Sequence, residues 1–202
     1  MDRTDLLDGA PHPRGPWIRA AIVFYGVILT AAVAWRSGWA GEPLLYASAE
    51  AAQAGLSLPR DIALGLVAAG AVIGLSSELT RRTRFGAELA RTLAQLLGPL
   101  TVAQCVVLAL SSGIAEEAFF RGALQPRVGL LAASLLFGAA HLAPRRELLP
   151  WTAFSIAAGF LLGGLFEWTG NLVAPVVCHV VVNAVNLRLL TRDAAASFSV
   201  RP

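Results

Sequence analysis

Six stretches without charged side chains alternate with polar segments along this chain of 202 residues. They occupy residues 20–35, 62–77, 92–115, 128–144, 148–166 and 172–187. A helix needs about 17–25 predominantly apolar residues to cross a bilayer, so the shorter runs need their flanking residues to reach that length. The pattern predicts an all-α fold, a polytopic membrane helical bundle of about six hydrophobic helices.

The chain reads as one domain between two polar tails. Residues 1–16 hold three aspartates and three prolines and predict a polar N-terminal tail. We expect a single membrane-embedded domain at residues 17–190 and a polar C-terminal tail at 191–202. The first apolar run lacks a clean small-residue cleavage site, so we expect it to be retained as a span. The longest connection contains residues 44–56, a candidate interfacial helix.

Composition supports the membrane assignment. Hydrophobic residues make up 56% of the chain and charged residues 14%, whereas an ordinary soluble domain has about 25% charged residues. The pI is near 9.5, but the arginines lie at the ends of apolar runs, so we expect no nucleic-acid partner. Cys105 and Cys178 lie inside apolar runs without zinc-finger spacing, and we expect buried free thiols.

The arginines also predict an orientation. With six simple spans, 12 of the 16 basic residues fall on the side of the N-terminus. The other side holds only Arg36, Arg60, Arg121 and Arg127. Since cytoplasmic loops carry the excess of basic residues, we expect both termini in the cytoplasm.

Ionisable side chains gather in three places within the apolar runs. Each costs about 2.5–3.5 kcal/mol at the centre of a bilayer on insertion scales, so a function is expected. The first place is Glu116 and Glu117, followed by Arg121. On a helix Glu117 and Arg121 share a face and neutralise one another, which leaves Glu116 free to act as a base. A charged helix end at the membrane surface is the alternative interpretation.

The other two places hold the histidines. Phe137 and His141 are four residues apart, and His179, Asn183 and Asn186 form one polar stripe on an apolar segment. Alone, His141 could be an interfacial histidine, and the stripe could be hydrogen-bond contacts between helices. Together with Glu116 the set suffices for peptide hydrolysis: Glu116 and one histidine deprotonate a water, and the other histidine and Asn183 stabilise the oxyanion.

These residues resemble a known family. The patterns EExxxR, FxxxH and HxxxN, in this order on successive hydrophobic segments, are similar to the motifs of the CPBP family, the CAAX proteases and bacteriocin-processing enzymes also called the Abi family. The motif core spans residues 113–186. The resemblance implies a glutamic-type intramembrane endopeptidase in which Glu116 and His141 activate the water and His179 and Asn183 hold the oxyanion. The supporting residues would be Glu117, Arg121, Phe137 and Asn186.

The resemblance also implies a setting and a class of substrate. It indicates a multi-pass protein of the bacterial inner membrane that acts on a membrane-anchored or lipidated protein or peptide, with a CAAX-like end, a sorting tail or a leader peptide. No cofactor is expected on this interpretation. A divalent metal such as zinc, held by Glu116, His141 and His179, is the open alternative, although HExxH is absent and Asn183 is a poor zinc ligand.

Simple spans conflict with this site. If residues 92–115 cross the membrane outward and 128–144 cross back, Glu116 and His141 lie about 20 Å apart by helical rise. We therefore expect one helix to be broken at Ser111, Ser112 and Gly113, and the Glu116 carboxylate to lie within about 8 Å of the His141 ring, the reach of one bridging water.

Two other functions fit parts of the pattern. A non-enzymatic immunity or partner-binding membrane protein could keep the same fold. A proton-coupled carrier could use Glu116 and the histidines as a relay, although such carriers usually have repeated halves, and the sequence shows no repeat. The complete set of polar groups favours the enzyme, because a binding protein does not need every one of them.

Overall fold

The computed structural model describes the backbone of residues 15–199 and the exposure of the side chains of residues 16–192. The predicted N-terminal tail therefore lies almost wholly outside the described residues, and so does the end of the C-terminal tail. The helices, in chain order, are α1 (Gly15–Val33), η1 (Ala34–Trp39), α2 (Ala49–Ala54), α3 (Leu58–Arg82), α4 (Arg84–Leu97), α5 (Val102–Glu117), η2 (Ala118–Leu124), α6 (Gln125–Ala140), η3 (Arg146–Leu148), α7 (Leu149–Thr169) and α8 (Val173–Ser199). No named strand occurs in this part of the chain.

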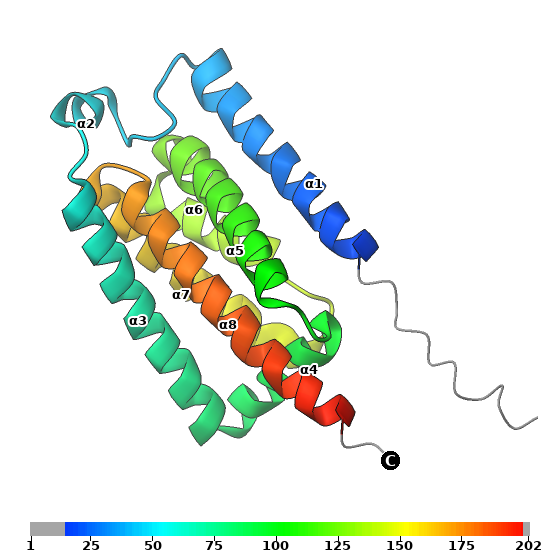
Figure 1. The fold of residues 1–202 in the computed structure, drawn as a ribbon. Helices are drawn as coiled ribbons and strands as arrows, with labels where there is room; N and C mark the ends of the chain where they lie inside the picture. Colours follow the sequence, from blue (N-terminus) through cyan, green and yellow to red (C-terminus); the bar gives the residue numbers. More distant parts are fainter. Residues whose placement is uncertain (1–14, 200–202) are drawn as a thin grey trace, which may run out of the picture.

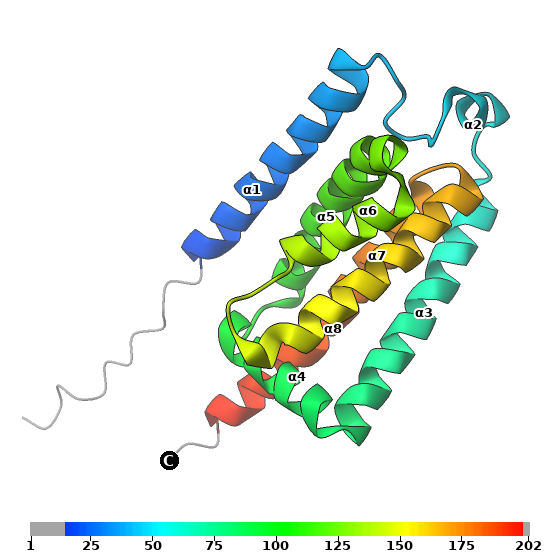
Figure 2. The ribbon, with the colours of Figure 1, turned by 180° about the vertical axis from the view of Figure 1, so that it is seen from behind.

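The long helices form a single bundle around α8. Helix α8 packs against α3 on one side and α5 on the other, and α7 packs against α6 and α8. Helix α1 lies along α5 at the edge of the bundle (Figures 1 and 2). The all-α bundle predicted from the sequence is thus confirmed.

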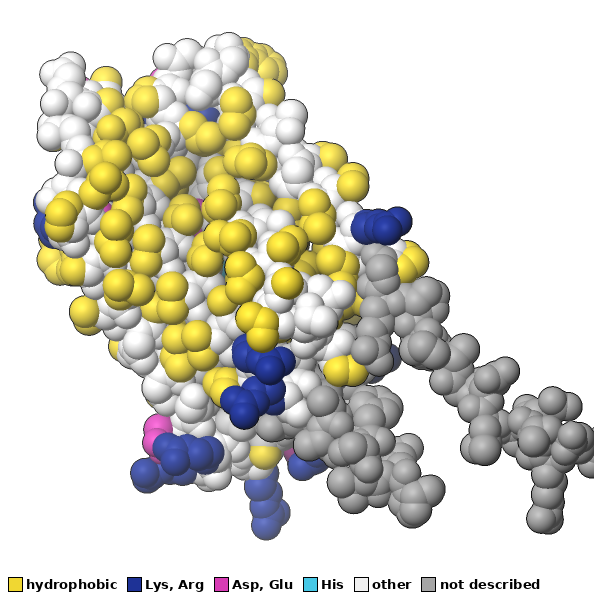
Figure 3. Space-filling model, in the orientation of Figure 1, with side chains coloured by type: hydrophobic (Ala, Val, Ile, Leu, Met, Phe, Trp, Pro, Cys, Tyr) yellow, Lys and Arg dark blue, Asp and Glu magenta, His cyan; other side chains and the backbone are white. Residues whose placement is uncertain are grey.

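Within the described residues, five helical stretches are long and apolar enough to span a membrane: Pro16–Trp39, Leu58–Arg82, Val102–Ala140, Arg146–Thr169 and Val173–Arg192. Hydrophobic side chains cover much of the outer surface (Figure 3). Val67 on α3 and Val27 on α1, for example, are 73% and 63% exposed. A surface of this kind suits lipid rather than water, and the chain is a multi-pass membrane protein.

Glycines allow α8 to approach its neighbours closely. A Cβ added at Gly65 of α3 would lie 2.7 Å from the Ala174 carbonyl oxygen, and one at Gly113 of α5 would lie 2.7 Å from a methyl group of Val180. Small residues at such crossings are typical of helix packing in membranes. Gly113 therefore sets the distance between α5 and α8, the two helices that carry most of the polar residues.

The predicted break at Ser111, Ser112 and Gly113 is wrong. Helix α5 continues through all three residues to Glu117. The Ser112 hydroxyl donates to the carbonyl of Ala109 at 3.4 Å, so the serine is accommodated within the helix.

The departure from a straight span lies further along the chain. Residues Ala118–Leu124 form a π-helical segment. Gly129 then takes a φ of 81°, which favours glycine and kinks the chain inside α6. The third and fourth apolar runs consequently share one bent element, Val102–Ala140. The bend brings the end of α6 back to α5.

The first residues of the third apolar run also fold differently from a span. Residues 92–97 belong to α4, which begins at Arg84 and lies at one end of the bundle. Its exposed face mixes charged and apolar residues. The candidate interfacial segment 44–56 contains the short helix α2. Both cysteines are buried and free, as predicted.

Arginines divide between the two ends of the bundle. Arg81 and Arg82 lie at the α3–α4 junction, at the end where α1 begins and α8 ends. Basic side chains gather at this end (Figure 3). Arg36 and Arg127, predicted for the opposite side, both form ion pairs with Glu42 near the end of α1. Which end faces the cytoplasm stays a prediction.

Candidate active site

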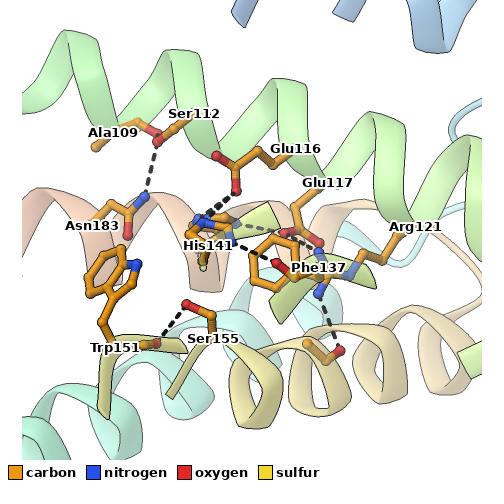
Figure 4. A network of polar contacts seen from close by, with 12 residues as sticks. Ala109, Ser112, Glu116, Glu117, Arg121, Phe137, His141, Trp151, Ser155 and Asn183 are labelled. Carbon is orange, nitrogen blue, oxygen red and sulfur yellow. Dashed lines mark hydrogen bonds and ion pairs between the residues drawn. The ribbon is translucent and has the colours of Figure 1, made fainter. Parts of the chain in front are cut away.

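The four residues predicted to catalyse hydrolysis come together in the structure. Glu116 lies in the last turn of α5, His141 directly follows α6, and His179 and Asn183 lie one turn apart on α8. The Glu116 carboxylate faces His141 between these helices (Figure 4). The Glu116 Oε2 atom is 3.7 Å from His141 Nε2 and 3.9 Å from His179 Nε2. The expected proximity of Glu116 to His141 is confirmed.

Glu117 and Arg121 form the predicted pair, completely inside the protein. Arg121 Nη1 donates to Glu117 Oε1 at 3.0 Å, and Nη2 donates to the carbonyl of Gly159 on α7 at 3.2 Å. The guanidinium also lies 4.3 Å from the centre of the Phe137 ring. Arg121 is 1% exposed. The prediction that it lies in a segment on the side of the membrane opposite the N-terminus is therefore wrong. The charge of Arg121 is compensated within the bundle.

Glu117 has a second partner that the sequence did not predict. His179 Nδ1 donates to Glu117 Oε1 at 2.6 Å. This contact fixes the orientation of the imidazole and turns its Nε2 toward Glu116. Glu117 therefore holds Arg121 and His179 together, and its role is to position other side chains.

Glu116 differs from Glu117 in its surroundings. Its Oε2 atom is buried and has no hydrogen-bond partner among the described residues. The separations to the two Nε2 atoms exceed a hydrogen-bond length, while they are within the reach of a bridging water. The free carboxylate predicted from the spacing of Glu117 and Arg121 is thus Glu116.

His141 is held from several sides. Its Nδ1 lies 2.7 Å from the carbonyl oxygen of Phe137, which can only accept, so Nδ1 carries a proton. In this tautomer, Nε2 presents a lone pair toward Glu116. The centre of the His141 ring lies 4.6 Å from the ring centre of Phe137 and 5.9 Å from that of Trp151 on α7. The Thr152 hydroxyl donates to the His141 carbonyl at 3.2 Å.

The two asparagines of the α8 stripe lie in different places. Asn183 Nδ2 donates to the Ser112 hydroxyl oxygen at 3.0 Å, beside the site (Figure 4). Asn186 Oδ1 instead accepts a 3.5 Å contact from Ser76 on α3. The structure therefore places Asn183 beside Glu116 and the histidines and directs Asn186 toward the α3–α8 interface.

Burial gives the site a closed and an open side. Glu117 and Arg121 are almost completely buried, and Glu116 and His179 are only 7% and 8% exposed. His141 and Asn183 are half-buried. Leu142, the residue after His141, is 62% exposed. A substrate would therefore approach from the side of His141 and Asn183.

A metal was the open alternative for three of these residues. In the part of the chain that the structure describes, no group of three or more His, Cys, Asp or Glu side chains is arranged to hold a metal ion. The donor atoms that converge are Glu116 Oε2 and the Nε2 atoms of His141 and His179. The expected absence of a metal stays a prediction.

Sequence reasoning missed several residues that support the site. Ser112 was interpreted as part of a helix break, and the structure has it as the partner of Asn183. Thr152 and Trp151 hold His141 from α7. The position of Trp151 next to an apolar run was interpreted as a membrane-interface signal. Only the packing of α7 against α6 reveals these contacts.

Comparison with known proteins gives a consistent result for the middle of the chain. Residues 98–185 match the family model described as Type II CAAX prenyl endopeptidase Rce1-like. The chain is also 42% identical over 87 residues to the uncharacterized protein YpbD of Bacillus subtilis (strain 168), which is 42% of this chain and 44% of YpbD. The chain thus matches less than half of the length of this relative. No solved structure matches.

Proposed function

We propose that this chain is a glutamic-type intramembrane endopeptidase of the CPBP family, because residues 98–185 match the model of the Rce1-like type II CAAX prenyl endopeptidases. It would hydrolyse a peptide bond of a membrane-associated substrate with water that Glu116 activates. All four residues of the proposed site, Glu116, His141, His179 and Asn183, fall within the matched region.

The observation that carries this proposal is the meeting of two hydrogen-bond acceptors. Neutral His141 presents the lone pair of Nε2, and Glu116 presents Oε2, at a separation of 3.7 Å. Two acceptors cannot bond to each other, but a water between them can donate one proton to each. Such a water would be oriented and polarised for attack.

The reaction then follows from the positions of the groups. Glu116 takes a proton from the water, and the oxygen attacks the carbonyl carbon of the substrate. The carbonyl oxygen becomes an oxyanion in a tetrahedral intermediate. When the carbon–nitrogen bond breaks, the proton on Glu116 passes to the leaving amine. The products are a carboxylic acid and an amine, and Glu116 returns to its starting carboxylate.

His179 and Asn183 are placed to donate to the oxyanion. Asn183 uses one Nδ2 hydrogen for Ser112 and keeps the second for substrate. The Nδ1 hydrogen of His179 is used in the hydrogen bond to Glu117. Nε2 can therefore donate to the oxyanion only when the ring carries a second proton, as imidazolium. Glu117 Oε1, 2.6 Å from Nδ1, holds the ring in the orientation that turns Nε2 toward the site.

The setting favours a substrate that is itself anchored in the membrane. The site is enclosed by apolar helices, and its half-buried side holds the exposed Leu142. A hydrophobic anchor would concentrate a substrate beside this opening. CAAX-like ends, sorting tails and leader peptides all meet this requirement. We propose that the end of the bundle where α1 begins and α8 ends faces the cytoplasm of a bacterial inner membrane, because Arg81 and Arg82 lie there and cytoplasmic loops carry the excess of basic residues.

A direct assay uses the purified full-length protein in lipid nanodiscs and a farnesylated peptide with a CAAX sequence, labelled with a fluorophore and a quencher. Wild-type protein should cleave it, and the Glu116→Gln variant should not. Glu88 of α4 is exposed and far along the chain from the site, so Glu88→Gln is the matched control and should cleave normally. Equal cleavage by Glu116→Gln and wild type would overturn the proposal.

A further inference from the structure

Helix α1 buries one narrow stripe of side chains. Ile18 and Ala32 are 7% and 0% exposed, and most other residues of α1 are exposed. Tyr25 lies midway between them, seven residues from each, and is half-buried. Positions seven residues apart fall on nearly the same face of a helix. Among the buried and half-buried side chains of α1, Tyr25 has the one polar group.

The ends of the stripe show what Tyr25 faces. Ile18 packs with Leu108 of α5, and Ala32 packs with Ala118 directly after α5. The middle of the stripe therefore lies opposite the last turns of α5. The half-buried Tyr25 side chain on this face lies close enough to the Glu116 carboxylate to be affected by its charge.

The histidines near Glu116 do not fix the orientation of its carboxylate. Its Oε2 atom faces two imidazoles without a hydrogen bond from a described residue. A carboxylate can rotate about its terminal bond, and that rotation would exchange the two oxygens. A donor on Oε1 would stop the rotation and keep Oε2 toward the water.

We propose that Tyr25 is a positioning residue for Glu116, whose hydroxyl donates to Oε1 and so fixes Oε2 toward His141 and His179. The proposal deepens the endopeptidase function and rests on it for its effect on rate. Tyr25 lies outside residues 98–185, so the matched family region does not contain it. Helix α1 would thereby contribute to catalysis as well as to membrane anchoring.

The contact is tested first, without any substrate, by a double-mutant cycle on thermal unfolding of the full chain in detergent. Tyr25→Phe should lower Tm by about 3–12 °C in the wild-type background, as expected for one lost hydrogen bond to a charged group. In the Glu116→Ala background the same change should leave Tm nearly unaffected. Equal shifts in both backgrounds would overturn the proposal.

The chain offers a matched control for this cycle. Tyr46, the other tyrosine, lies in the segment before α2. Tyr46→Phe removes the same atom, and its effect on Tm should be the same with or without Glu116. A coupling of Tyr46 to Glu116 as large as that of Tyr25 would show a general destabilisation and would contradict the proposal.

The positioning role is tested by kinetics with the farnesylated CAAX peptide. Tyr25→Phe should lower kcat about tenfold or more and leave KM within about twofold, because the lost contact orients the base rather than the substrate. Tyr46→Phe should match wild type. If Glu116→Gln is inactive and Tyr25→Phe retains full kcat, the positioning role is wrong. If Glu116→Gln is fully active, the endopeptidase function itself fails while the thermal cycle still decides the contact.

Discussion

His179 donates from Nδ1 to Glu117 Oε1 at 2.6 Å, and Glu117 Oε1 also accepts from Arg121 at 3.0 Å. One carboxylate oxygen thus links α5, η2 and α8 at a buried point. The neighbouring Glu116 has no such partner on its Oε2 atom. Adjacent glutamates therefore have different tasks, one in holding the site together and one in chemistry.

The two glutamates should respond differently to the same substitution. Glu117→Gln leaves the buried charge of Arg121 uncompensated, and we expect a loss of about 3–5 kcal/mol in unfolding free energy. Glu116→Gln should keep the yield and Tm of wild type while cleavage is lost. Thermal unfolding in detergent and peptide cleavage, measured on both variants, check this. A stable Glu117→Gln protein with full activity would contradict the division of tasks.

Asn183 should contribute to rate and little to substrate binding. Asn183→Ala removes a donor to the oxyanion, for which we expect a fall in kcat of about 100- to 1,000-fold. Ser112→Ala removes only the group that orients Asn183, so its effect should be clearly smaller. Initial rates over a range of peptide concentrations separate kcat from KM. If Asn183→Ala raises KM and leaves kcat unchanged, the asparagine binds substrate and does not stabilise an oxyanion.

The spacing between α5 and α8 should matter for activity. Gly113→Leu would drive a side chain into Val180 and push the helices apart, which separates Glu117 from His179. We expect a destabilisation of about 1–3 kcal/mol and a loss of cleavage. Gly74→Leu on α3 is the matched control, because nothing lies within 4 Å of a Cβ there. Equal tolerance of both changes would show that the close helix approach is not required.

Sequence patterns predicted the bundle, and they predicted that Glu116, His141 and His179 would lie close together. Charge-free runs correspond to the spanning elements because lipid demands apolar, internally hydrogen-bonded segments. Spacing identified the Glu117–Arg121 pair because residues four apart share a helix face. The free status of Glu116 followed from that pair.

The location of the bend could not be predicted in the same way. Ser112 and Gly113 resemble a break in local sequence, yet in the structure they serve the contact of α5 with α8. The actual bend uses a π-helical segment and Gly129, and it is set by tertiary packing. The approach of Tyr25 to Glu116 likewise depends on how α1 lies on α5. No spacing within one segment reports such a contact.

The mechanism should need no metal ion. Exhaustive treatment with EDTA and 1,10-phenanthroline, followed by removal of the chelator, should leave at least most of the peptide cleavage intact. The reason is that a carboxylate, two imidazoles and a carboxamide supply a base and oxyanion donors without a Lewis acid. Metal content measured on the same sample provides the control. Loss of activity that zinc alone restores would show that Glu116, His141 and His179 act as ligands.

Cleavage of membrane-associated substrates by this chain should depend on Glu116. The most direct measurement compares the membrane proteomes of cells that express wild type or Glu116→Ala at equal levels, with peptide ends mapped by mass spectrometry. We expect uncleaved substrate proteins in cells with the variant and their shortened products in cells with wild type. Identical peptide ends in both samples would contradict this prediction and favour a non-enzymatic membrane protein with the same fold.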